Sequence, residues 1–254
     1  MSENLVLQNS AVISVDGVVG GVSVSAAPVR LSSFEDRRPV RSFRITPVAA
    51  PAKPLQLALK RIMDICGAFL GLLVLSPLLL AVAALIKLES RGPVFFRQLR
   101  TGLNEAPFEI YKFRSMYTDL CDNSGVRQTV SNDPRITRIG RVLRKTNLDE
   151  LPQLWNVLVG DMSLVGPRPH VPDMLAAGVD YAELVEGYEF RHLMRPGLTG
   201  LAQARGLRGP TDHRLTAVRR VFCDVEYVRN FSVLLDIKIM FRTLVNELRG
   251  GTGF

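Results

Sequence analysis

The sequence predicts an α+β protein in which a membrane-inserted helix precedes a small, mostly helical domain with one β-hairpin and amphipathic surface helices. Three observations lead to this class. Residues 65–86 form an uncharged, apolar run of 22 residues, about the length that a membrane helix needs. Residues 93–100 and 107–113 have the apolar and aromatic content of paired strands. Later segments place apolar residues at helical spacing.

Composition and charge limit the function classes. The chain has 254 residues, 47% hydrophobic and 22% charged, which is too apolar for a disordered protein and too charged for a polytopic transporter. Lys and Arg number 32 against 24 Asp and Glu, and the net charge of +8 favours phosphates, an anionic membrane or nucleic acid as partners. The three cysteines lack a CxxC pair and the three histidines lack zinc spacing. A disulfide framework and a structural zinc site are therefore excluded, and a reducing compartment is expected.

Residues 1–54 are predicted to be a disordered leader. They mix small apolar residues with Gly, Ser and Pro, without a helical period. Glu3 and Asp16 precede the first basic residue, Arg30, which does not fit the positive n-region of a signal peptide. Arginines between residues 37 and 44 form a loose basic cluster, which indicates either a solvated linker or a tether to anionic headgroups.

Residues 55–90 are predicted to form a re-entrant membrane helix that is broken at Ser76-Pro77. Proline in the middle of the run removes an amide donor and clashes with the preceding turn. Each half, of about 11 residues, rises only about 16 Å, half of a bilayer core of about 30 Å. Lys and Arg flank both ends of the run, and the positive-inside rule places both ends in the cytoplasm. On the residues alone, a kinked helix that crosses the membrane remains an alternative.

Residues 91–254 are predicted to be a cytoplasmic domain. A turn at residues 102–104 joins the two strands into a β-hairpin. Residues 118–134 and 160–172 are expected to be loops, and 148–158, 181–191 and 215–230 to be helices. A last helix either lies on a membrane or packs on a core. Its apolar residues recur at spacings of three and four: Leu234, Ile237, Phe241, Leu244 and Leu248.

Candidate chemistry is concentrated between residues 132 and 169. Several arginines precede the acidic pair Asp149-Glu150, and a Gly-Pro-Arg-Pro turn centred on Arg168 follows it. Guanidinium groups bind phosphate oxygens in pairs, and a carboxylate among them stays ionised at neutral pH. Such an aspartate could attack phosphorus, and a neighbouring glutamate could hold Mg²⁺ on the departing phosphate. Each feature has a plainer interpretation: helix-dipole complementation, a solvated helix face, or a rigid turn.

The order of these segments resembles the monotopic phosphoglycosyl transferases, also called bacterial sugar transferases. The resemblance runs from residue 60 to near residue 248, about three-quarters of the chain. Its most specific part is LDELPQLWNVL at residues 148–158 followed by GDMSLVGPRP at residues 160–169. The other matching segments are KRIMD (60–64), Ser76-Pro77, GPVFFRQ (92–98), YKFRSM (111–116), RPGLTGLAQARGLRG (195–209) and a closing pattern of Asp224, Tyr227, Asn230, Ser232 and Asp236.

The resemblance implies transfer of a sugar-1-phosphate from a nucleotide diphosphate sugar, usually a UDP-sugar, to polyprenyl phosphate, with release of UMP. Asp149 would be the nucleophile that forms a phosphosugar intermediate, and Glu150 would bind Mg²⁺ or handle protons. Arg144, Arg168, Lys112 and Arg114 would contact the substrate phosphates or the nucleotide. The membrane element of the family is a re-entrant helix broken at a Ser-Pro pair.

The resemblance also implies partners and a location. It places the chain on the cytoplasmic face of a bacterial inner membrane, in contact with membrane lipids, and in exopolysaccharide or O-antigen synthesis. The oligomeric state is left open, with a homodimer as one state to test, and the sugar is not identified. A non-catalytic, membrane-bound scaffold or regulator is the alternative, which the intact Asp149-Glu150 pair argues against. Nucleic acid is not expected as a partner, because stacking aromatics and recognition motifs are absent from the sequence.

Overall fold

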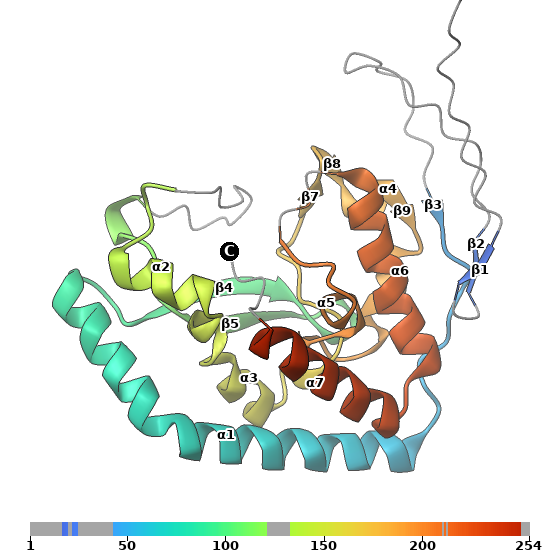
Figure 1. Cartoon of the computed structure of the whole chain (residues 1–254). Helices are drawn as coiled ribbons and strands as arrows, with labels where there is room; N and C mark the ends of the chain where they lie inside the picture. Colours follow the sequence, from blue (N-terminus) through green and yellow to red (C-terminus); the bar gives the residue numbers. More distant parts are fainter. Residues whose placement is uncertain are drawn as a thin grey trace, which may run out of the picture.

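A long bent helix runs beneath a mixed domain and up one of its sides (Figure 1). The computed structural model describes residues 43–120, 133–209, 211 and 213–249, together with the backbone of 17–19 and 22–24. Within this part of the chain, helices combine with separate two-stranded sheets, so the mixed helix and sheet class predicted from the sequence is confirmed. The predicted loop at residues 118–134 lies mostly outside the described residues.

Helix α1 (Pro54–Glu89) is continuous through Ser76 and Pro77. Its 36 residues span about 54 Å, and the helix bends in its second half (Figure 1). The predicted break is therefore a bend in one helix, as expected where proline removes a backbone hydrogen bond. Among the described residues, α1 is the one helix long and apolar enough to cross a membrane, and most of its surface is exposed.

The predicted β-hairpin is confirmed. Strands β4 (Phe95–Thr101) and β5 (Pro107–Phe113) pair antiparallel from Phe95 opposite Phe113 to Thr101 opposite Pro107. The other described pairs are short. Two of them are antiparallel: β1 (Gly17–Val19) with β2 (Val22–Val24), and β7 (Leu175–Ala176) with β8 (Val179–Asp180). Two are parallel: β6 (Ser163–Val165) with β10 (Gly197–Thr199), and β3 (Phe43–Arg44) with β9 (Val185–Glu186).

Six further α-helices complete the described domain, and one of them, α6, contributes to two of its hydrophobic clusters. The six helices are α2 (Arg138–Lys145), α3 (Gln153–Val159), α4 (Tyr181–Leu184), α5 (Leu201–Ala204), α6 (Arg214–Asn230) and α7 (Val233–Leu248). Val221 and Val225 of α6 are fully buried, and Tyr227 and Val228 pack with Val165 of β6. The predicted helices 215–230 and 234–248 are therefore confirmed.

Two predicted helices are shorter than expected. The segment 148–158 becomes helical only at Gln153, because Pro152 has no amide to donate, and Leu148–Glu150 form a single 3-10 turn. The segment 181–191 is divided into α4, strand β9 (Val185–Glu186) and a 3-10 segment, Tyr188–Leu193. Gly187 divides it, since its φ of 93° lies in the left-handed region that helices do not use.

The leader predicted for residues 1–54 is described with its side chains only from Phe43 onward. This last part lies against the domain, since strand β3 (Phe43–Arg44) pairs in parallel with β9. Ile45 is buried beside Val185 and Val218. The end of the predicted leader is thus ordered, because its apolar residues complete the core around α6.

The apolar stripe of α7 faces away from the domain. Its five residues, Leu234, Ile237, Phe241, Leu244 and Leu248, are all exposed. The buried residues of α7 are Asp236 and Ile239, on the opposite side of the helix. Of the two interpretations of this stripe, packing on the core of the chain is therefore wrong.

Candidate active site

The acidic pair lies in a tight turn between α2 and α3. Asn147 adopts a left-handed conformation with φ of 55°, which ends the run of α2 and turns the chain into the 3-10 turn Leu148–Glu150. The turn contacts β5 and α2. As a result, Asp149 is buried, at 8% exposure, and Glu150 is half-buried next to it.

Glu150 is held by two cations from different parts of the chain. Its Oε1 accepts hydrogen bonds from Lys112 Nζ on β5 at 2.7 Å and from Arg168 Nη2 at 2.6 Å. Its Oε2 accepts another from Arg168 Nη1 at 3.1 Å. Burial raises the pKa of Glu150, but the charges and hydrogen bonds of Arg168 and Lys112 outweigh burial and hold this pKa well below its ordinary value. Glu150 is therefore a fixed negative charge between the two cations.

Asp149 has a different environment. Among the described residues, no donor forms a hydrogen bond with its carboxylate. Burial raises the pKa of Asp149 to about 6, and the charge of Glu150 acts in the same direction. The charges of Lys112, Arg144 and Arg168 oppose this rise. Two adjacent carboxyls thus have pKa values pushed apart, which is typical of sites that assign them different roles.

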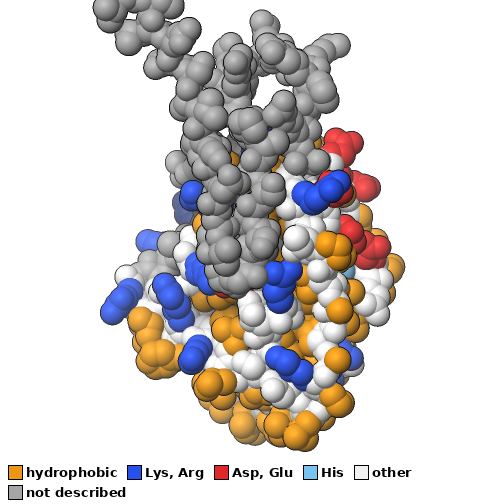
Figure 2. Space-filling view, turned by 90° about the vertical axis from the view of Figure 1, so that its right-hand side faces the viewer, with side chains coloured by type: hydrophobic (Ala, Val, Ile, Leu, Met, Phe, Trp, Pro, Cys, Tyr) orange, Lys and Arg blue, Asp and Glu red, His pale blue; other side chains and the backbone are white. Residues whose placement is uncertain are grey.

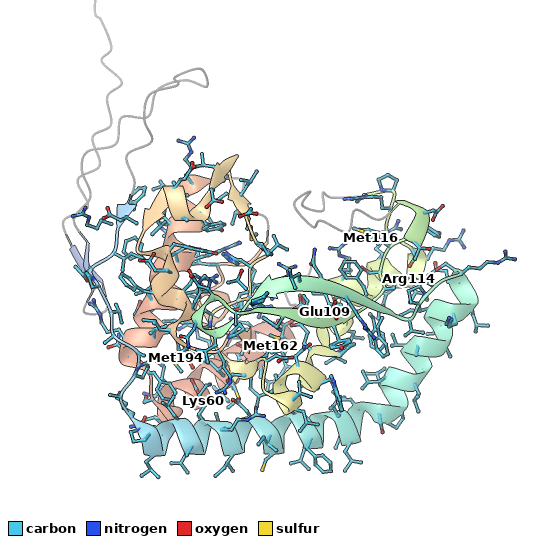
Figure 3. All side chains as sticks on the ribbon, turned by 180° about the vertical axis from the view of Figure 1, so that it is seen from behind. Lys60, Glu109, Arg114, Met116, Met162 and Met194 are labelled. Atoms are coloured by element: carbon cyan, nitrogen blue, oxygen red, sulfur yellow. The ribbon has the colours of Figure 1, made fainter. Side chains whose placement is uncertain are left out.

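Of the four predicted phosphate-binding residues, Lys112, Arg144 and Arg168 face the acidic pair, and Arg114 does not. The Arg114 guanidinium is buried and donates to the carbonyl oxygens of Ser90 and Arg91, both at 2.7 Å, just beyond the end of α1. Figure 3 shows Arg114 beside this end of the helix. Its donors satisfy carbonyls at a helix C-terminus, which is a structural role, and the structure does not place Arg114 with the acidic pair.

The comparisons with known proteins identify the family. A family model described as bacterial sugar transferase matches residues 55–250. The chain belongs to the bacterial sugar transferase family. The resemblance seen in the sequence is confirmed, and so is the prediction that the chain is an enzyme of the phosphoglycosyl transferase type.

Three relatives of this sugar transferase have informative names. The chain is 60% identical over 200 residues, 79% of its length, to the exopolysaccharide production protein PSS of Rhizobium leguminosarum bv. phaseoli, and covers all of that protein. It is 52% identical over 195 residues to an undecaprenyl-phosphate glucose phosphotransferase of Komagataeibacter xylinus. It is 48% identical over 194 residues to the UDP-glucose:undecaprenyl-phosphate glucose-1-phosphate transferase of Escherichia coli K12. The match to the Komagataeibacter protein covers 77% of the chain and 37% of that relative. The match to the Escherichia coli protein covers 76% of the chain and 41% of that relative.

Glu150 of the transferase does not fit the expected role of a Mg²⁺ ligand. Both of its carboxylate oxygens already accept hydrogen bonds from Lys112 or Arg168, and a divalent cation there would lie against two like charges. Among the described residues, no group of three or more His, Cys, Asp or Glu could hold a metal. Asp149 is the carboxylate of the pair whose oxygens remain available for a cation.

Two arginines near the site were not predicted from the sequence. Arg191 is 1% exposed and donates to the carbonyl oxygen of Arg168 and to Asp224. Arg100 donates to the carbonyl of Pro169 at 3.4 Å, and burial together with the charge of Arg168 lowers its pKa to about 10. Arg191 lies just before residues 195–209, and Arg100 lies just after residues 92–98, two segments of the family resemblance. This proximity is the only signal of the two arginines that the sequence offers.

Proposed function

We propose that this transferase moves a sugar-1-phosphate from a UDP-sugar to undecaprenyl phosphate and releases UMP. In the first step, a carboxylate oxygen of Asp149 attacks the phosphorus that bears the sugar. The bond from that phosphorus to the bridging oxygen breaks, and UMP leaves with the electron pair. In the second step, a phosphate oxygen of undecaprenyl phosphate attacks the same phosphorus and displaces the Asp149 carboxylate. The product is undecaprenyl diphosphate sugar, and no net proton is needed.

The environment of Asp149 supports the nucleophile assignment. A nucleophile needs oxygen lone pairs that are not committed to other donors. Among the described residues no donor bonds the Asp149 carboxylate, whereas both oxygens of Glu150 accept hydrogen bonds. With a pKa of about 6, this carboxyl is ionised at neutral pH yet stays more basic than an ordinary aspartate. Lys112, Arg144 and Arg168 lie close enough to Asp149 to affect its pKa, so they can also neutralise a diphosphate placed beside it.

In this mechanism, Glu150 positions the two cations. Its ion pairs fix Lys112 and Arg168 at the place where the phosphate charge would arrive, before the substrate binds. Mg²⁺ is proposed as a partner of the donor diphosphate, because this ion accepts one or two carboxylates plus substrate phosphates as ligands. When bound, it would neutralise charge on the departing phosphate.

The contacts of α1 support a re-entrant helix inserted from the cytoplasmic side. Near its start, Lys60 pairs with Asp236 of α7, and at its end Arg114 binds the carbonyls of Ser90 and Arg91. Both ends therefore belong to the same domain, which cannot lie on two sides of a membrane. Between them, α1 exposes apolar side chains to the surroundings: Phe69, Leu70, Leu73, Val74 and Leu80.

The surface charge fits the same orientation. Figure 2 shows hydrophobic side chains gathered along the lower edge of the molecule, where α1 lies, with Lys and Arg above them. Helix α7, which carries the exposed stripe, runs beside the first half of α1 (Figure 1). An apolar surface bordered by basic side chains matches the boundary between acyl chains and anionic headgroups. The enzyme would thus meet undecaprenyl phosphate at the inner face of a bacterial inner membrane.

The activity is tested by UMP release. Wild type and Asp149→Asn, in nanodiscs with Mg²⁺, are given UDP-glucose, UDP-galactose or a UDP-N-acetylhexosamine with undecaprenyl phosphate. We expect wild type to release UMP from one of them and Asp149→Asn to release none. Without acceptor, intact-protein mass spectrometry should show one phosphosugar on wild type. A wild type that releases no UMP from any donor would instead support the scaffold interpretation.

The membrane arrangement is tested by cysteine labelling. Leu55 and Leu88 lie near the two ends of α1 and are 73% and 83% exposed. Each is changed to Cys in a chain whose three native cysteines are Ala. A reagent that cannot cross membranes should label both positions in inverted vesicles and neither in spheroplasts. Labelling of one position in spheroplasts would show a crossing helix.

A further inference from the structure

The segment 165–168, which carries Arg168 to Glu150, is held at both ends by a buried cation. Lys60 Nζ donates to the carbonyl oxygen of Val165 at 2.7 Å. Arg191 Nη2 donates to the carbonyl oxygen of Arg168 itself. Lys60 is 4% exposed and Arg191 is 1% exposed, so neither cation is available to a substrate in solvent.

Each of these cations is neutralised by one aspartate of the closing sequence pattern. Asp236 Oδ2 accepts from Lys60 at 2.7 Å, and its Oδ1 accepts from the Tyr227 hydroxyl at 2.8 Å. Asp224 Oδ2 accepts from Arg191 Nε at 3.0 Å and from Nη2 at 2.7 Å. Both aspartates are buried, at 0% and 3% exposure. A buried ion pair contributes little net stability compared with apolar packing, so stability alone does not account for two of them at one loop.

Backbone hydrogen bonds fix the middle of the same segment. The amide of Gly166 donates to Thr199 O, and Pro167 O accepts from the amide of Gly197, both at 2.9 Å. The main chain is thus tied on all sides, and the side chain of Arg168 is the part that reaches Glu150. Lys60 adds a further link, because it lies on α1, on the side that faces the domain (Figure 3).

We propose that Lys60–Asp236 and Arg191–Asp224 are positioning pairs that hold the Arg168 segment so that the guanidinium meets Glu150 and the phosphates. The inference rests on the proposed function and extends it to four residues outside the site. It also connects the membrane helix to the acidic pair through Lys60, Val165 and Arg168. The pairs never contact substrate; they act through Arg168.

The test compares Asp224→Asn and Asp236→Asn with Glu226→Gln. Each Asn variant keeps the shape of the side chain and removes the charge that neutralises its cation. Glu226 is the matched control, because it lies on α6 near Asp224 and pairs with Arg205, away from the Arg168 segment. We expect kcat to fall by about 10- to 100-fold in both Asn variants, since small displacements of a positioning group have effects of this size. Glu226→Gln should keep the wild-type kcat.

The pH profile separates positioning from a structural role. If Arg168 leaves Glu150, both acidic residues lose a cation, their pKa values rise, and the acid limb of kcat moves to higher pH. The other cations that face the pair, Lys112 and Arg144, are unchanged. Around Arg191, burial and the charge of Arg191 lower the pKa of His192 to about 3 and that of His170 well below its ordinary value, so both stay neutral. A lower kcat in Asp224→Asn and Asp236→Asn, with the acid limb at its wild-type pH, would show only that fewer molecules are folded and active. That result would overturn the proposal.

A readout without turnover covers the case in which the proposed reaction is wrong. Hydrogen exchange at the amides of Gly166, Arg168 and His170 is measured on the full chain in nanodiscs. We expect faster exchange there in Asp224→Asn, and in Arg191→Lys, which keeps the charge but cannot form the same hydrogen bonds to both Arg168 and Asp224. Exchange at wild-type rates in both variants would overturn the positioning role. Absence of any transfer by wild type would overturn only the proposed function.

Discussion

Ser76 donates its hydroxyl to the carbonyl oxygen of Leu73 at 2.8 Å. This carbonyl lies four residues before Pro77, so it is the one that proline leaves without an amide donor. In an apolar surrounding, an unpaired carbonyl is costly, and the serine supplies the missing donor one residue earlier. The Ser-Pro pair thus bends α1 without leaving an unsatisfied backbone group at the bend.

The first prediction is that Ser76 matters only while Pro77 is present. Ser76→Ala should lower the free energy of unfolding by about 1 kcal/mol, the usual contribution of one hydrogen bond. In a Pro77→Ala background the amide of residue 77 supplies the donor, and Ser76→Ala should then cost close to nothing. Thermal unfolding of the four proteins in nanodiscs measures this cycle. Equal costs in both backgrounds would show that the two residues act independently.

The second prediction is that Asp149→Asn inactivates the enzyme and stabilises it. Burial raises the pKa of Asp149 from 3.8 to about 6, so the folded state is penalised where this carboxyl is ionised. The penalty is absent below about pH 4, grows as the pH rises and is complete above about pH 6. A shift of about two units corresponds to about 2–3 kcal/mol. At pH 8 the free energy of unfolding of Asp149→Asn should exceed that of wild type by this amount. At pH 4 the two free energies should be equal.

The third prediction concerns the two basic residues that end the hairpin. Lys112→Gln removes a charge that lowers the pKa of Asp149, so the acid limb of kcat should move from near pH 6 to higher pH. Arg114→Gln removes donors from carbonyls beyond the end of α1 and should destabilise the fold by about 1–3 kcal/mol. The acid limb of Arg114→Gln should stay at its wild-type position. A limb that moves equally in both variants would return Arg114 to the site.

Local patterns predicted the elements that depend on local physics. The hairpin follows from two strand-like runs around a turn, and the apolar stripe of α7 follows from helical spacing. The acidic pair was visible because Asp149 and Glu150 are adjacent inside a specific motif. Arg114 was predicted as a site residue from the Lys-Phe-Arg segment of the resemblance, but β5 ends at Phe113 and the Arg114 side chain donates to a carbonyl beyond the end of α1.

Contacts between distant residues could not be read from the sequence. Arg191 reaches Arg168 across 23 residues and Asp224 across 33, and Lys60 reaches Asp236 across 176. The side chains of these two ion pairs also have a plain interpretation as solvated charges, and only their burial distinguishes them. The four are Lys60, Arg191, Asp224 and Asp236, each at 4% exposure or less. Tertiary packing decides such roles, so the positioning pairs appear only in the structure.

The fourth prediction separates the two half-reactions through α7. Phe241 and Leu244 belong to the exposed stripe, at 68% and 56% exposure, so changing both to Ser should leave the free energy of unfolding nearly unchanged. The control is Leu215→Ser, because Leu215 is 48% exposed but lies at the end of α6 farthest from α7.

If α7 seats the domain on the bilayer, loss of its apolar side chains disturbs the approach to a lipid-bound acceptor and not to a soluble donor. In the Phe241/Leu244 variant, the phosphosugar intermediate should therefore form from UDP-sugar alone at the wild-type rate. Transfer from this intermediate to undecaprenyl phosphate in nanodiscs should slow by about tenfold or more. Leu215→Ser should keep both rates. Equal slowing of the two half-reactions would place the defect in the active site, and two unchanged rates would mean that α1 alone seats the enzyme.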